Sequence, residues 1–214
     1  MRVRGRLVAG LLTVLLAASG CANEPAVGDN PVLQPGRPGE GNKTLSPEEA
    51  STAAPKVEPN DADVTYARTM IGHHLQAVEM SALAPQRALD PKLKGLAARI
   101  GDTQQPEIDM MNRWLSEHGK PTVETGHSGH GGHSEHEDMP GMATPEQLTA
   151  LAAATGADFD RQFLQLMIKH HEGAVTMAGQ VQRTGADIRI QEMADNVVAE
   201  QSDEITRMRA MLGA

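Results

Sequence analysis

The 214-residue sequence predicts an all-α protein, a four-helix bundle made of two repeated helical hairpins. Three observations favour this fold class. The chain has four aromatic residues and 12 Met besides many Ala and Leu, a composition that suits helices better than the strands of a β-sandwich. Residues 63–115 align without a gap on residues 160–212, and 15 of the 53 pairs are identical. Within the copies, apolar residues recur at spacings of three and four, as in amphipathic helices.

The first 20 residues predict a secretory signal peptide. Arg2, Arg4 and Arg6 precede an apolar run over residues 7–18, which is too short to span a membrane and ends in small residues just before Cys21. This arrangement resembles a bacterial lipoprotein signal, in which the cysteine becomes the lipidated first residue of the mature chain. We therefore expect an extracytoplasmic protein of the cell envelope, lipid-anchored to the cell membrane. The alternative is an ordinary secreted protein with an unmodified cysteine.

Residues 21–60 are expected to form a disordered Pro/Gly-rich tether. The segment contains seven Pro and no sustained apolar periodicity, so it cannot bury enough surface to offset the entropy lost on ordering. Inside it, Ser46 followed by Pro47 predicts one short helical turn.

The four-helix bundle is expected over residues 61–214. Periodicity and turn residues place its long helices near residues 61–83, 90–117, 158–183 and 187–212. Asp90 is a suitable N-cap for the second of these helices, with Pro91 at its first position. Pro106 lies in the middle of the same helix, where we expect a kink at a cost of about 3 kcal/mol.

The repeat places polar side chains on the apolar faces of all four helices. On a helical wheel, the second His of each His-His pair lies near the middle of the apolar face and the first lies at its margin. On the partner helices, a Gln lies within the apolar stripe and a Glu at its margin. The residues concerned are His73, His74, Gln104 and Glu107 in the first copy and His170, His171, Gln201 and Glu204 in the second.

These repeated side chains predict a metal site. A buried imidazole or amide without a partner costs about 1–3 kcal/mol, so its presence at matched positions of both copies points to a ligand. Imidazole binds Zn, Cu, Ni and Fe, whereas thioether sulfur selects chiefly Cu(I). We therefore expect copper as the cofactor, with zinc or another divalent metal as the alternative. The Gln and Glu residues are candidates for orienting the ligands. The predicted ligands are His73, His74, His170, His171, Met70, Met80, Met167 and Met177.

The segment between the copies, residues 120–143, predicts a mobile loop with metal ligands of its own. Its Gly and Ser content argues against a helix, and His-rich tracts bind divalent metals with modest affinity. The possible loop ligands are His127, His130, His133, His136, Met139 and Met142. After the loop, Thr144 and Gln147 form a capping-box pattern that predicts a short helix ending near Gly156.

Both copies carry the motif Met-x-x-His-His-x-x-Ala, beginning at Met70 and Met167, and each is followed by Gln-x-x-Glu-Ile-x-x-Met. With the Met-Pro-Gly-Met segment at residues 139–142, this pattern resembles the bacterial domain-of-unknown-function family 305 over about residues 61–212. The resemblance implies a ferritin-like four-helix bundle outside the cytoplasm. It also implies copper binding and copper tolerance, which some members of that family show.

The predicted function is that of a metal-binding protein that sequesters copper or passes it to a partner. The net charge of −9 and the scarcity of aromatic residues argue against nucleic acid as a partner. One alternative is a metal-free interaction module whose His pairs are structural. A di-iron oxidase is less favoured, because its Glu-x-x-His motif is missing: Glu107 is followed three residues later by Met110, and Glu204 by Arg207. We therefore expect no enzymatic activity.

Overall fold

The computed structural model describes residues 32–53, 57–124 and 139–213. The chain divides into two compact units, residues 1–56 and residues 57–214, and each is described by itself. Within the described ranges, no helix has the length and apolar character needed to cross a membrane. The predicted signal peptide and several single residues lie outside the described ranges: Cys21, His127, His130, His133 and His136.

The described part of the first unit contains a small antiparallel hairpin and a short helix. Strand β1 (Val32–Gln34) pairs with β2 (Lys43–Leu45), and helix α1 (Pro47–Ala53) follows. Ser46 caps this helix reciprocally with Glu49: the Ser46 hydroxyl accepts from the Glu49 amide at 3.2 Å, and the Glu49 carboxylate accepts from the Ser46 amide at 2.8 Å. The helical turn was predicted, whereas the two strands were not.

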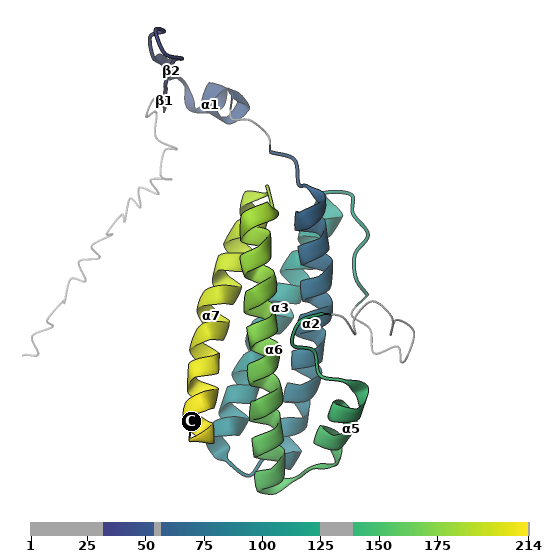
Figure 1. Cartoon of the computed structure of the whole chain (residues 1–214). Helices are drawn as coiled ribbons and strands as arrows, with labels where there is room; N and C mark the ends of the chain where they lie inside the picture. Colours follow the sequence, from purple (N-terminus) through teal and green to yellow (C-terminus); the bar gives the residue numbers. More distant parts are fainter. Residues whose placement is uncertain (1–31, 54–56, 125–138, 214) are drawn as a thin grey trace, which may run out of the picture. The chain divides into compact units, whose positions relative to one another are not determined.

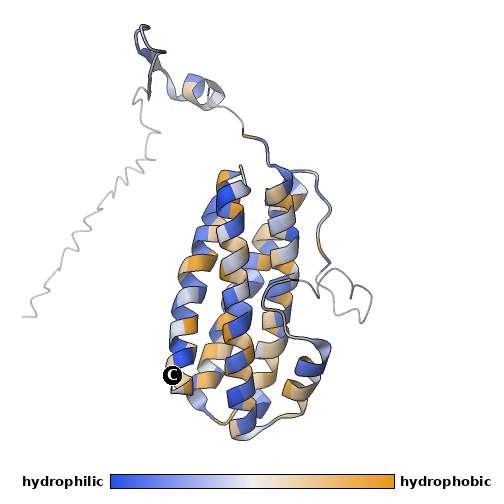
Figure 2. Ribbon diagram, viewed as in Figure 1, coloured by the Kyte–Doolittle hydropathy of each residue, from blue (hydrophilic) through white to orange (hydrophobic). Residues whose placement is uncertain are grey.

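The second unit is an all-α bundle, as the sequence predicts (Figure 1). Its long helices form two hairpins, α2 (Asp61–Arg87) with α3 (Pro91–Glu117) and α6 (Gly156–Thr184) with α7 (Ile188–Leu212). The short helix α5 (Pro145–Ala153) packs against both α2 and α6. In Figure 2, hydrophilic and hydrophobic residues are interspersed along each long helix, as amphipathic helices of a bundle require.

Helices α2 and α6 pack on each other in antiparallel orientation. At one end of the bundle, the amide of Asn60 donates to the carbonyl of Thr184 at 2.8 Å. At the other end, the carboxylate of Asp160 accepts from the backbone amides of Leu89 at 3.0 Å and Asp90 at 2.9 Å. The start of each helix therefore lies beside the end of the other, and the two copies of the repeat are related by an approximate two-fold axis.

An aspartate at the start of each hairpin holds the turn of the other hairpin. Asp160 binds the turn before α3, and its counterpart Asp63, which is fully buried, accepts from the amides of Ala186 and Asp187 at 3.0 and 3.1 Å. Asp90 and Asp187 in turn cap the helices that they precede. The Asp pair at matched positions thus joins the two copies at both ends of the bundle.

The helix boundaries differ from the predicted ones mainly at proline. Helix α2 continues through Pro85 to Arg87, four residues beyond its predicted end, and α3 continues through Pro106. Each proline lacks an amide hydrogen, so the helix loses one backbone hydrogen bond at that point while packing maintains the helix on both sides. The capping box of Thr144 and Gln147 at the start of α5 is confirmed, with bonds of 3.3 and 2.9 Å.

Candidate metal centre

A layer of polar side chains crosses the bundle at mid-height and separates two apolar clusters. On every long helix, one stretch of core residues belongs to the first cluster and another to the second, with polar residues between them. On α2, for example, Ile71 belongs to one cluster and Ala77 to the other. We call this set the polar layer: His73, His74, Gln104, His170, His171 and Gln201.

All four imidazoles of the polar layer are fully buried. The helical wheel placed His73 and His170 at the margin of the apolar face, and in the structure this margin is fully buried. The margin of α2 faces α6 directly, so the two rings lie against each other with centroids 3.7 Å apart and planes inclined by 35°. His171 lies next to this pair, with its ring centroid 6.2 Å from that of His170.

Two of the histidines are oriented by glutamates on the neighbouring helix of the same hairpin. His74 Nε2 donates to Glu107 Oε2 at 2.8 Å, and His171 Nε2 donates to Glu204 Oε2 at 2.7 Å. A carboxylate only accepts, so Nε2 carries the proton of each of these bonds, and the lone pair of the neutral form is on Nδ1. Carboxylate–histidine pairs of this type orient metal ligands and raise their basicity.

The paired rings of His73 and His170 have no carboxylate partner, and their hydrogen bonds differ from each other. His73 Nε2 donates to the carbonyl oxygen of Pro140 at 3.0 Å, so Nδ1 of His73 also keeps its lone pair. Neither ring nitrogen of His170 has a hydrogen-bond partner among the described residues. Three imidazoles of the layer therefore have a defined tautomer and the fourth does not.

Buried polar atoms without a partner are concentrated in the polar layer. Within the described residues there are eleven such side-chain atoms, and nine of them belong to the layer. Five are imidazole nitrogens, and four are the amide atoms of Gln104 and Gln201, whose side chains are 2% and 3% exposed. Leaving each such atom unsatisfied costs about 1–3 kcal/mol. Lone pairs of buried imidazoles are the donors that copper and zinc accept, so the layer fits a metal ion by the type of its atoms.

The electrostatics of the layer keep its central histidines neutral. Burial lowers the pKa of His73 to about 3, and burial together with the neighbouring imidazoles lowers the pKa of His170 well below its usual value. An imidazole must lose its proton to bind a metal. At neutral pH, protons therefore do not compete for these two side chains.

The layer is not arranged as a finished chelate. Within the described ranges, no three His, Cys, Asp or Glu side chains stand together in a group that could hold a metal ion. The stacked rings of His73 and His170 present faces rather than nitrogens to each other. In this arrangement, three or more of the imidazoles of the described chain do not meet at one point where an ion could be bound.

The predicted methionine ligands lie in the two apolar clusters on either side of the layer. Met70 and Met177 belong to one cluster, and Met80 and Met167 belong to the other. Each cluster therefore receives one of the four predicted methionine ligands from each copy, because α2 and α6 run in opposite directions. Met177 is partly exposed and the other three are fully buried.

The ends of the predicted loop are bound to the bundle. At the start, the side chain of Asn112 donates to the carbonyl of Val123 at 3.0 Å and accepts from its amide at 2.8 Å. At the other end, Met139 and Ala143 are buried, and Met142 is partly buried. The bond from His73 to the carbonyl of Pro140 was not predicted, since a backbone atom 67 residues away leaves no periodic signal in the sequence.

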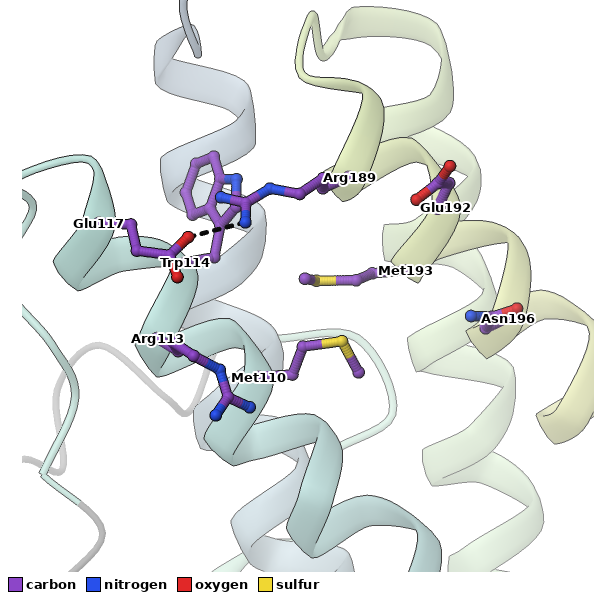
Figure 3. A pocket seen from close by; sticks show the side chains of 8 residues that line it. All are labelled: Met110, Arg113, Trp114, Glu117, Arg189, Glu192, Met193 and Asn196. Carbon is purple, nitrogen blue, oxygen red and sulfur yellow. Dashed lines mark hydrogen bonds and ion pairs between the residues drawn. The ribbon is translucent and has the colours of Figure 1, made fainter. Parts of the chain in front are cut away.

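A groove between α3 and α7 lies apart from the polar layer (Figure 3). The thioethers of Met110 and Met193 point into it, and the ion pair between Glu117 and Arg189, 2.7 Å long, lies above them. Neither methionine was a predicted ligand. Two guanidinium groups, of Arg113 and Arg189, and two carboxylates, of Glu117 and Glu192, line the same groove, and it contains no imidazole, so it offers fewer copper ligands than the layer.

In a comparison with protein families, the model described as domain of unknown function DUF305 matches residues 63–212. A protein of known sequence, the uncharacterized protein L153 of Acanthamoeba polyphaga mimivirus, is 44% identical over 55 residues. That match covers 26% of this chain and spans 36% of the length of the viral protein.

Comparison with solved structures gives longer matches. A DUF305 protein from Streptomyces coelicolor is 33% identical, with a TM-score of 0.63 over 71% of this chain and 92% of that chain. CopM in its Cu(I)-bound form is 31% identical, with a TM-score of 0.57 over 70% of this chain and 94% of that chain. CopM has also been solved in Cu(II)-bound and silver-bound forms.

Proposed function

The chain belongs to the DUF305 family, and on that premise we propose that it binds copper in the polar layer and serves copper sequestration or transfer outside the cytoplasm. The observation that carries this proposal is the set of buried imidazole nitrogens without partners at matched positions of the two copies. A bound cation would accept the buried imidazole lone pairs among these nine atoms and would offset that part of their cost.

Copper is favoured over other metals by the donor types and by one relative. Imidazole lone pairs suit Cu(II) and Cu(I), and the flanking thioethers suit Cu(I). CopM, which resembles this chain in sequence and structure, binds Cu(I), Cu(II) and silver. Silver(I) and Cu(I) are both soft ions with the same preference for sulfur, which is consistent with a site built from imidazole and thioether.

The proposed ligands are imidazoles of the polar layer, completed by thioethers from the clusters above and below. The glutamates Glu107 and Glu204 orient two of the imidazoles through their Nε2 atoms. The loop histidines, which lie outside the described residues, are proposed as a second and weaker site, because a Gly-rich segment must lose more conformational entropy on binding.

The location proposed for the protein rests on its first 21 residues. The basic start, the short apolar run and Cys21 form the pattern of a lipoprotein signal, so we propose a lipid anchor in the cell membrane and a site of action in the cell envelope. Metabolic labelling with a radioactive fatty acid tests this: the full chain becomes labelled and a Cys21→Ser variant does not. Equal labelling of the two would refute the anchor.

Titration of the purified protein with Cu(I) against a competing chelator tests the copper site. We compare a variant of the layer, in which the four histidines His73, His74, His170 and His171 are Leu, with a variant of the loop, in which His127, His130, His133 and His136 are Leu. Leucine fills the space of imidazole without orphaned polar atoms, so the layer variant keeps its helices in circular dichroism. We expect the tightest Cu(I) site to be lost in the layer variant and retained in the loop variant. The reverse result would show that this site lies in the loop.

One observation favours a second candidate function, that of a metal-free interaction module. The imidazoles do not converge on one point among the described residues, and the stacked pair is packed as a structural contact. Elemental analysis after copper loading separates the two functions. Copper bound in a fixed ratio to protein supports the first function, and protein free of metal after removal of unbound copper supports the second.

A further inference from the structure

The segment Met139–Ala143, here called the strap, is held on the bundle from two sides. On one side, the amide of Gln76 on α2 binds both backbone groups of Ala143: Nε2 donates to the carbonyl at 3.0 Å, and Oε1 accepts from the backbone amide at 2.7 Å. In Figure 1 the segment that leads into α5 passes in front of α2, on the side next to α6. A two-point bond of this kind fixes both the place and the orientation of the backbone.

On the other side, the strap touches the backbone of α6 at a glycine. A Cβ atom at Gly173 would overlap the Pro140 carbonyl and would lie 2.9 Å from Cα of Gly141. Gly141 has a φ of +83°, and a Cβ atom there would lie 3.0 Å from Cα of Gly173. The two glycines therefore permit a direct contact between the backbones of the strap and α6, and a side chain at either position would force these backbones apart.

Gln76 and Gly173 occupy the same position in the two copies of the repeat, at the offset that pairs His73 with His170. In the first copy, Gln76 holds the strap by hydrogen bonds. In the second copy, Gly173 has no side chain, so the backbone of the strap can contact α6. The strap can lie in only one direction across the two-fold axis, so it contacts the two copies differently. As a result, the Pro140 carbonyl is 3.0 Å from Nε2 of His73, and the strap offers no such acceptor to His170.

We propose that the strap is a positioning device for His73: it holds the Nε2–H tautomer of that imidazole and thereby presents the Nδ1 lone pair inside the polar layer. Gln76 and Gly173 are then positioning residues, because they place the Pro140 carbonyl without contacting a bound ion. The consequence for copper affinity rests on the proposed function, whereas the tautomer of His73 is a property of the metal-free protein. Loss of an acceptor that orients a metal-binding His typically weakens metal binding about 10- to 100-fold.

Two substitutions on opposite sides of the strap test the proposal, each with a readout in the metal-free protein and one with copper. Gly173→Ala displaces the Pro140 carbonyl, and Gln76→Ala releases Ala143. Gly179→Ala is the matched control, because it makes the same change on α6 where a Cβ atom would meet only the Arg183 guanidinium at 3.6 Å. Nitrogen-15 NMR of the imidazoles reports the tautomer of His73, and competition with a chelator reports the affinity for Cu(I).

We expect His73 to be the Nε2–H tautomer in the unmodified protein and in Gly179→Ala, and a mixture of tautomers in Gly173→Ala and Gln76→Ala. Cu(I) affinity should fall about 10- to 100-fold in the two strap variants and stay unchanged in the control. An unchanged His73 tautomer in both folded strap variants overturns the proposal. A changed tautomer of His73 with an unchanged affinity for Cu(I) also overturns it, because the position of the strap would then have no effect on copper binding. If the unmodified protein binds no copper, the proposed function fails, and the NMR result alone decides whether the strap sets the tautomer.

Discussion

The glutamates that accept from the buried imidazoles act through single hydrogen bonds. Replacing Glu107 or Glu204 by Ala removes the acceptor of His74 or His171, so the imidazole loses its fixed tautomer. We expect Cu(I) affinity to fall about 10- to 100-fold in each variant, and less in the corresponding Gln variants, whose carbonyl still accepts. Glu117→Ala is the control, since Glu117 pairs with an exposed arginine far from the layer. Competition titrations measure the effect, and equal affinities across the set would show that these carboxylates serve only solubility.

The two glutamines of the polar layer allow a test of whether buried amides without partners destabilise the metal-free protein. Gln104 and Gln201 are buried, and none of their four amide atoms has a partner in the described part of the chain. Replacement of either by Leu removes two orphaned atoms and keeps a side chain of similar size. We expect the free energy of unfolding of the metal-free protein to stay equal or to rise by about 1–3 kcal/mol. Urea denaturation measures this change, and a loss of more than about 1 kcal/mol would show that water or another partner satisfies these amides.

The helices of the bundle are joined through their ends as well as their faces. Asp63 is fully buried and accepts from two backbone amides at the turn before α7, while Asp61 on the same first turn is exposed. We expect Asp63→Ala to lower the free energy of unfolding by about 2–3 kcal/mol, because the variant leaves buried amides without an acceptor. Asp61→Ala should change it by less than about 1 kcal/mol. Thermal and urea unfolding compare the two; equal effects would contradict the role assigned to Asp63.

For the molecule as a whole, the neutral histidines make stability depend on pH. The pKa of His73 is lowered to about 3 and that of His170 well below the usual 6.5, mainly by burial. Below pH 6.5 the unfolded chain binds protons at these positions and the folded protein does not, so the stability of the metal-free protein falls as the pH falls toward 3. Above 6.5 both states are neutral there, and this contribution is constant.

We expect the free energy of unfolding to decrease by about 1 kcal/mol per pH unit for each of the two histidines between pH 6 and pH 4. In a variant with Leu at positions 73 and 170, the free energy of unfolding depends less on pH. Subtracting its values from those of the unmodified protein removes the contribution of the carboxylates, which both proteins share. Urea midpoints at several pH values provide the measurement. Parallel curves for the two proteins would show that the histidines are not held neutral.

Much of the bundle follows from the sequence, because it depends on local signals. The repeat, the spacing of apolar residues and the caps at Asp90 and Thr144 predict the helices to within a few residues. The burial of the repeated His pairs could be predicted only in part. His73 was placed at a margin because a wheel describes one helix, and the partner that covers that margin lies on α6.

The remaining features depend on contacts between distant parts of the chain. The bond of Asp63 to the turn at Asp187 spans 124 residues, and the bonds of His73 and Gln76 to the strap span 67. Such contacts follow from how the two hairpins dock, which no periodicity encodes. A comparison of the copies does contain a signal: Gln76 and Gly173 differ at a position that lies between the identical His-His and Ala-Val pairs, and this difference marks where the two halves are used differently.

The strap also bears on why the two halves share one chain. Two separate hairpins of identical sequence could assemble into the same bundle as a homodimer, with the same imidazoles on its symmetry axis. Such a dimer would need both a glutamine and a glycine at one and the same position to hold a single crossing segment, which no single gene product can supply. Tandem duplication of a hairpin followed by divergence at Gln76 and Gly173 removes this contradiction. In the fused chain the two matched imidazoles His73 and His170 can therefore have different surroundings, which a symmetric dimer would not allow.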